Sequence, residues 1–76
     1  MNKYFFKYLP EKGTSPDPII LPFEINLTKD EVSQNIVTIL NGHKFMYIGE
    51  YGIRSKDINL WWVEDATEES WKRLEG

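Results

Sequence analysis

The sequence predicts an α+β domain: a four-stranded, mainly antiparallel sheet with its main helix packed on one face. Three observations lead to this fold class. A capped amphipathic segment lies at residues 28–41, four short segments rich in aromatic and β-branched residues surround it, and the chain has only 76 residues. A chain this short forms one domain, so residues 1–76 are treated as a single unit. The predicted order is strand, strand, helix, strand, strand, helix.

Two strands are predicted before the helix, at residues 2–9 and 19–27. In the first, the face expected in the core carries Tyr4, Phe6 and Tyr8, and the other face carries Lys3, Phe5, Lys7 and Leu9. In the second, strict alternation places a core face at Ile19, Leu21, Phe23, Ile25 and Leu27. Pro22 cannot donate a ladder hydrogen bond, which favours an edge strand or a bulge. Residues 10–18, "PEKGTSPDP", form the predicted loop.

The segment "TKDEVSQNIVTILN" at residues 28–41 has helix signals at both ends. Thr28 and Glu31 have the spacing of a capping box, in which each side chain accepts a hydrogen bond from the other residue's backbone amide. An apolar stripe follows at Val32, Ile36, Ile39 and Leu40. Asn41 and Gly42 then predict a left-handed stop.

Residues 43–51 and 57–64 predict two further strands, with the loop "GIRSKD" between them. Their short separation predicts that they pair with each other as an antiparallel hairpin. Met46 and Ile48 suit the helix-packed face of the first of these strands, which leaves Phe45 and Tyr47 on the opposite face.

The C-terminal segment "DATEESWKRLEG" predicts a short second helix. Either Asp65 with Glu68, or Thr67 alone, is suited to cap it. Trp71 and Leu74 lie three residues apart and therefore on one side. This helix either covers a sheet edge, shares the face of the first helix, or shields part of the other face.

The chain contains no cysteine and a single histidine, His43. The lack of cysteine excludes a disulfide, a thiolate zinc site and a cysteine nucleophile. Any Ser-His-Asp arrangement has to use His43, and no serine lies in a recognisable nucleophile context. Metal-binding and phosphate-binding motifs are also missing. We therefore predict no enzymatic activity, no catalytic residue, no metal and no cofactor.

Charge and hydropathy narrow the range of partners. The formal net charge is −3, which argues against a general nucleic-acid binder. The charge is uneven, because residues 43–56 hold Lys44, Arg54 and Lys56 against Glu50, a net of +2. The apolar run in "MNKYFFKYLP" is too short for a signal peptide, and no segment is long enough to span a bilayer. We expect a cytoplasmic protein with no membrane partner.

The adjacent tryptophans in "DINLWWVEDA" point to opposite faces of a strand. Because Ile58 and Leu60 share a side with Trp62, we expect Trp62 in the core and Trp61 on the far face of the sheet. That far face is predicted to carry Phe5, Phe45, Tyr47 and Trp61, with Lys3 and Lys7 around them. These six residues form the predicted partner-binding surface.

Three interpretations of this aromatic surface compete. The last helix covers it, with Trp71 packed on Trp61; or it binds another protein or a second copy of the chain; or it stacks the bases of single-stranded nucleic acid. The chain lacks the motif of RNA-recognition sheets, and its order of elements differs from theirs. We predict a small protein-interaction module, a regulator or inhibitor of a larger protein. The alternative is a module for single-stranded nucleic acid that uses the same face, and a small enzyme comes third.

Overall fold

The computed structural model describes residues 1–11 and 17–75, and it confirms the α+β class. Most of the loop predicted at residues 10–18 lies outside the described residues. The elements are β1 (Asn2–Pro10), β2 (Ile19–Ile25), α1 (Lys29–Gly42), β3 (Phe45–Ile48), β4 (Tyr51–Arg54), a short 3-10 turn (Ser55–Asp57), β5 (Ile58–Asp65) and α2 (Glu68–Glu75). Among the described residues, neither helix is long and apolar enough to cross a bilayer.

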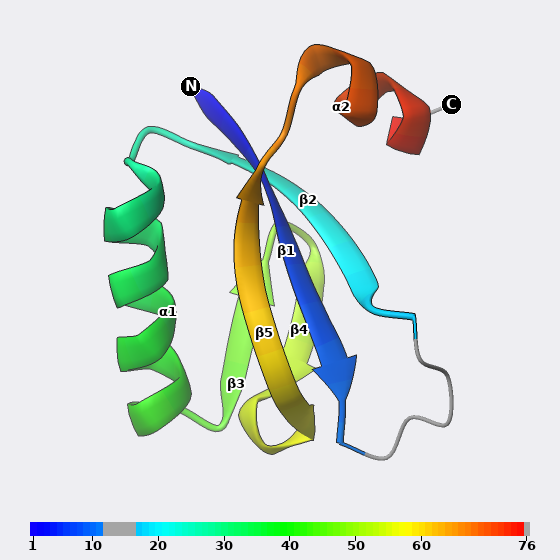
Figure 1. The fold of residues 1–76 in the computed structure, drawn as a ribbon. Coiled ribbons are helices and arrows are strands. Elements are labelled where there is room, and N and C mark those ends of the chain that lie inside the picture. The colour runs from blue at the N-terminus through cyan, green and yellow to red at the C-terminus, as the bar shows by residue number, and fades with distance from the viewer. Residues whose placement is uncertain (12–16, 76) are drawn as a thin grey trace.

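The strands form two separate sheets instead of the predicted four-stranded one (Figure 1). The first has three antiparallel strands in the order β2-β1-β5, and the second is the hairpin β3-β4. The predicted pairing of the third strand with the fourth is therefore wrong, because β5 pairs with β1 and β3 pairs with β4. In Figure 1 the hairpin lies behind the three-stranded sheet, and α1 lies along one side of both.

A turn at Gly49 explains why residues 43–51 do not form one strand. Ile48 pairs with Tyr51, so Gly49 and Glu50 are the two turn residues. Gly49 has a φ of +58°, whereas no described residue other than glycine has a positive φ. Glycine at the first of the two positions fits a type II′ turn, whose twist matches the strands it joins. The chain therefore reverses within the predicted strand, and residues predicted as a loop form β4 instead.

The core lies between the inner face of the three-stranded sheet, α1 and the hairpin. Phe6 lies at its centre, fully buried on β1, and is paired with Leu21 on β2 and Val63 on β5. The other buried members of this cluster are Tyr4, Val32, Ile36, Met46, Ile48 and Ile53. Tyr4 also donates its hydroxyl to the Leu27 carbonyl at 2.7 Å, which ties the central strand to the start of α1.

The capping box and the apolar stripe predicted for α1 are confirmed. The Thr28 amide donates to Glu31 Oε1 at 3.0 Å, and the Glu31 amide donates to Thr28 Oγ1 at 3.3 Å. Val32 and Ile36 are buried, and Ile39 and Leu40 pack against the same core. The helix ends at Gly42, but the predicted left-handed stop is wrong. Instead, His43 caps it in an extended conformation, with its amide donating to the Ile39 carbonyl at 2.8 Å.

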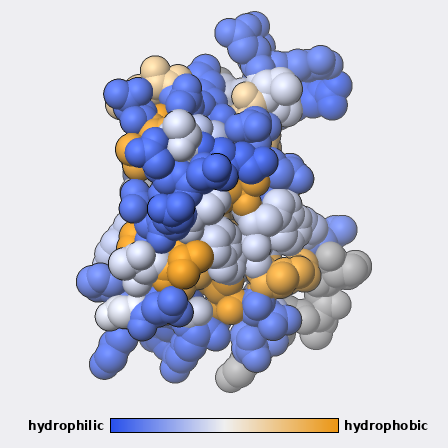
Figure 2. Space-filling model, turned by 60° about the vertical axis from the view of Figure 1, so that its left-hand side comes forward, coloured by the Kyte–Doolittle hydropathy of each residue, from blue (hydrophilic) through white to orange (hydrophobic). Residues whose placement is uncertain are grey.

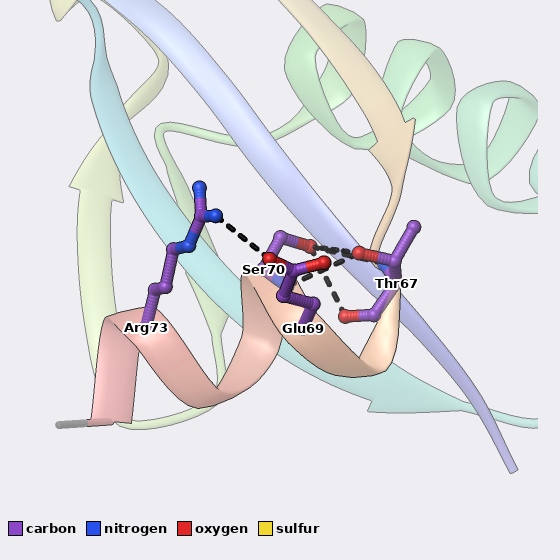
Figure 3. A network of polar contacts seen from close by, with 4 residues as sticks. All are labelled: Thr67, Glu69, Ser70 and Arg73. Atoms are coloured by element: carbon purple, nitrogen blue, oxygen red, sulfur yellow. Dashed lines mark hydrogen bonds and ion pairs between the residues drawn. The ribbon is translucent and has the colours of Figure 1, made fainter.

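Helix α2 is capped by Thr67, one of the two predicted caps (Figure 3). Thr67 Oγ1 accepts from the Ser70 amide at 3.1 Å, and Ser70 Oγ accepts from the Thr67 amide at 3.0 Å. Serine thus takes the place that glutamate has in the capping box of α1. One turn further on, Arg73 donates to Glu69 at 2.8 Å across the exposed side of the helix.

Candidate interaction surfaces

The structure separates the six residues of the predicted partner-binding surface. Lys3, Phe5 and Lys7 lie on the outer face of the three-stranded sheet, away from the core, as predicted. Trp61 points to the opposite, inner face, where it packs against the core. Phe45 and Tyr47 lie on a third surface, the outer side of the β3-β4 hairpin. No single face therefore combines the four aromatic and two basic side chains.

A bulge in β5 reverses the predicted positions of the two tryptophans. Leu9 pairs with Leu60 and Pro10 with Ile58, so Asn59 is an extra residue in β5. The alternation of side chains shifts by one residue at this point. Ile58 faces the core together with Trp61 and Val63, whereas Leu60, Trp62 and Glu64 face outward. The prediction continued the alternation of side chains from Ile58 past Asn59 without a bulge, and therefore placed Trp61 and Trp62 on the wrong faces.

Trp61 and Trp62 consequently have different surroundings. The Trp61 ring is partly buried and packs against the core cluster, with its centroid 5.9 Å from that of the Phe6 ring. On the outer face, Trp62 Nε1 donates to Glu64 Oε1 at 3.2 Å. The prediction that Trp61 lies on the far face of the sheet is therefore wrong.

Helix α2 covers one end of the outer sheet face. Its Trp71 stacks on Phe5 with a centroid distance of 6.0 Å and an interplanar angle of 18°. The Lys3 Nζ lies 5.1 Å from the centre of the same indole ring. The last helix thus shields part of the second face, as one of the three interpretations proposed, but its tryptophan packs on Phe5 and not on Trp61.

An ion pair occupies the middle of the outer sheet face. Lys7 of β1 pairs with Glu64 of β5, and this contact, with the Trp62 hydrogen bond, lowers the pKa of Glu64 below its ordinary value. Lys7 is thus engaged within the domain. Ile20, the partner of Lys7 on β2, and Leu60, the partner of Leu9 on β5, remain exposed on this face.

The outer side of the hairpin carries the two predicted aromatic residues that stay accessible. Phe45 is 47% exposed and Tyr47 is 73% exposed, while Met46 and Ile48 between and beside them are buried. This confirms the predicted faces of the strand. The Tyr47 ring lies over Gly52 on β4, with Cε1 3.1 Å from the position a Cβ there would take. We call Phe45 and Tyr47 the hairpin face. Across the view in Figure 2, apolar and weakly polar residues also form a band between hydrophilic regions.

A pocket with a basic lining adjoins the hairpin face, and we call it the basic pocket. It has a volume of about 510 Å³ and is lined by Leu40, His43, Lys44, Phe45, Arg54, Ser55 and Lys56. Its two sides are joined by two hydrogen bonds from Ser55: the hydroxyl donates to the His43 carbonyl at 2.6 Å and the amide to the Lys44 carbonyl at 2.9 Å. No carboxylate lines it. The net positive charge of residues 43–56 was visible in the sequence, but not that the two ends of this segment lie next to each other.

A metal site and a nucleophilic site each require a particular arrangement of side chains. The described residues include no group of three or more His, Cys, Asp or Glu side chains close enough to hold a metal ion. His43 and Ser55 are neighbours, but the Ser55 hydroxyl donates to the backbone carbonyl of His43 and not to its ring. In comparisons with known protein families, curated proteins and solved structures, nothing matches this chain.

Proposed function

We propose that the chain is a small non-enzymatic protein-interaction module that binds its partner through the hairpin face. The observation that carries this proposal is the exposure of Phe45 and Tyr47, 47% and 73%, side by side on one strand. Exposed aromatic side chains of this size are favoured anchors of protein interfaces, because each offers a large contact area with few rotatable bonds.

The anchors are held rigidly, which favours binding. β3 is held to β4 by a tight two-residue turn, and the buried side chains Met46, Ile48 and Ile53 fix the hairpin to the core. A partner therefore meets a preformed surface and loses little conformational entropy in binding. The partner is another protein or a second copy of the chain. In the first case the module regulates or inhibits that protein.

The alternative is a module for single-stranded nucleic acid. The basic residues on which it was based do not surround the exposed aromatic residues. It required Lys3 and Lys7 to surround the aromatic residues, but Lys7 is paired with Glu64 and Lys3 lies over Trp71. Both are on the outer face of the three-stranded sheet, away from Phe45 and Tyr47. Phe45 and Tyr47 themselves form an aromatic face without a basic side chain, which favours a protein partner, although the basic pocket adjoins this face at Phe45.

The test compares Tyr47→Ala with the matched control Val37→Ala, which removes a 46% exposed apolar side chain from α1. Wild type and both variants are used for affinity capture from the host and for sedimentation over a range of concentrations. Tyr47→Ala should weaken the captured complex or the self-association by about 2 kcal/mol, a factor of about 30, with unchanged thermal stability. Binding that is equal in all three proteins would place the interface elsewhere.

A further inference from the structure

We propose that the basic pocket binds a phosphate monoester whose organic part is apolar or aromatic. The first support is the unbalanced charge of its lining. Lys44, Arg54 and Lys56 line the pocket, and none of them forms an ion pair with another described residue. The lining contains no acidic side chain that could neutralise them, although the domain as a whole carries a net charge of −3.

Three like charges around one depression repel each other, and a bound anion removes that repulsion. A phosphate monoester carries a charge of about −1.5 to −2 near neutral pH, which suits three cations better than the single charge of a carboxylate or a diester. Arg54 can hold two phosphate oxygens at once, and the lysines can act as point charges. His43 adds a ring nitrogen that can donate to a further oxygen.

The apolar part of the lining indicates what the phosphate is attached to. Leu40 and Phe45 contribute apolar surface to the same pocket as the basic residues. A bare inorganic ion would leave this surface in contact with water, whereas an apolar or aromatic group would cover it. The volume of about 510 Å³ falls within the range typical of small-molecule sites. Two sources offer this chemistry: a free phosphorylated small molecule, or a phosphorylated tyrosine side chain.

The backbone on the two sides of the pocket is held in place. The two Ser55 hydrogen bonds hold the segment that follows α1 against the segment that follows β4. Phe45 and Arg54 are directly paired across the hairpin. Both residues also line a second depression, whose acidic side chains are Glu11 and Asp57, whereas the basic pocket has no acidic lining residue.

The probes are phenyl phosphate, phenyl sulfate, inorganic phosphate and a capped glycine–phosphotyrosine–glycine peptide. Each is titrated into the labelled chain, and the amide NMR shifts of the described residues are followed. Phenyl phosphate should give saturable shifts concentrated at residues 43–45 and 54–56. It should bind at least about tenfold more tightly than phenyl sulfate, which has the same shape but one charge. A peptide that binds more tightly than phenyl phosphate indicates the side-chain source, and equal affinity indicates the free small molecule.

The variants are Arg54→Gln and the matched control Lys72→Gln, which removes an exposed positive charge from α2. Arg54→Gln should weaken phenyl phosphate binding about tenfold or more, and Lys72→Gln should leave it unchanged. Tyr47→Ala should also leave it unchanged, because Tyr47 does not line the pocket. Loss of phenyl phosphate binding can therefore be distinguished from loss of protein binding by the hairpin face.

The proposal would be overturned by no saturable shift with phenyl phosphate, equal binding of phenyl sulfate, equal loss in both charge variants, or tighter binding of inorganic phosphate than of phenyl phosphate. A short oligothymidylate that binds this pocket more tightly than phenyl phosphate would also overturn it, because its phosphates are diesters. That last result would instead favour single-stranded nucleic acid.

Discussion

Trp71 of α2 stacks on Phe5 of β1, and this contact joins the last helix to the central strand of the sheet. It leaves Phe5 only 5% exposed, although alternation in the sequence puts this residue on the face opposite the core. Helix α2 has eight residues, too few to be stable as an isolated helix in water. Its folding therefore depends on the Trp71 contact.

Trp71→Ala should release α2 from the sheet. We expect the backbone amides of residues 70–74 to lose protection from hydrogen exchange, and the free energy of unfolding to fall by about 1–2 kcal/mol. Leu74→Ala is the matched control, since Leu74 lies on the same helix but is 44% exposed. Protection of α2 that survives Trp71→Ala would show that the Thr67 cap and the Glu69–Arg73 pair suffice to hold the helix.

The two adjacent tryptophans should differ in their effect on stability. Trp61→Ala removes a ring that packs against the core cluster and should lower the free energy of unfolding by about 3 kcal/mol, the lower end for such changes. Trp62 is also partly buried, but on the outer face, so Trp62→Ala should cost less, about 1–2 kcal/mol, for the lost burial and one hydrogen bond. Urea denaturation of both variants measures the difference, and the opposite order would mean that β5 has no bulge at Asn59.

The helices and the central strand could be predicted from the sequence because their signals are local. The capping box of Thr28 and Glu31 is contained in four residues, and the inward face of β1 follows from simple alternation. The errors arose where one residue changes the course of a strand. Asn59 shifts the alternation of β5, and Gly49 turns the chain back within a segment that looks like one strand.

Of the two candidate surfaces, the hairpin face could be predicted from the sequence and the basic pocket could not. Phe45 and Tyr47 alternate with two apolar residues, so their exposure follows from the pattern of β3. The basic pocket could not be predicted, because Lys44 and Arg54 lie ten residues apart and meet only through the turn at Gly49 and the pairing of β3 with β4. The net positive charge of residues 43–56 was its only sign in the sequence.

Thr28→Ala should destabilise the protein by about 1 kcal/mol at neutral pH, because it removes the acceptor for the Glu31 amide at the start of α1. Urea denaturation of wild type and variant measures this difference. Thr67→Ala is the matched change at the start of α2, and should expose only that helix to hydrogen exchange. Equal global losses would show that α2 unfolds together with the rest of the domain.

The contribution of the α1 cap should also depend on pH. Hydrogen bonds from the backbone and side chain of Thr28 lower the pKa of Glu31 below its ordinary value. A carboxyl group whose pKa is lowered in the folded state stabilises the fold above its unfolded-state pKa, and this stabilisation is lost as the pH falls through the folded-state pKa. The stability difference between wild type and Glu31→Gln, which keeps the Thr28 hydroxyl but removes the carboxylate, should therefore shrink as the pH falls through the lowered pKa of Glu31. A constant difference would mean that the carboxylate does not take part in the cap.

Glu64 offers the last test, because two partners on the outer sheet face lower its pKa by different amounts. The hydrogen bond with Lys7 has a larger effect than the one from Trp62. Lys7→Gln should therefore raise the Glu64 pKa more than Trp62→Phe does, which a titration followed by carboxyl ¹³C NMR measures directly. The pKa of Glu31 serves as the internal reference, since neither change touches α1. Because this pair is partly exposed, Lys7→Gln should lower the free energy of unfolding by less than about 1 kcal/mol. A larger shift in Trp62→Phe would show that the indole, not the lysine, holds Glu64 in its charged form.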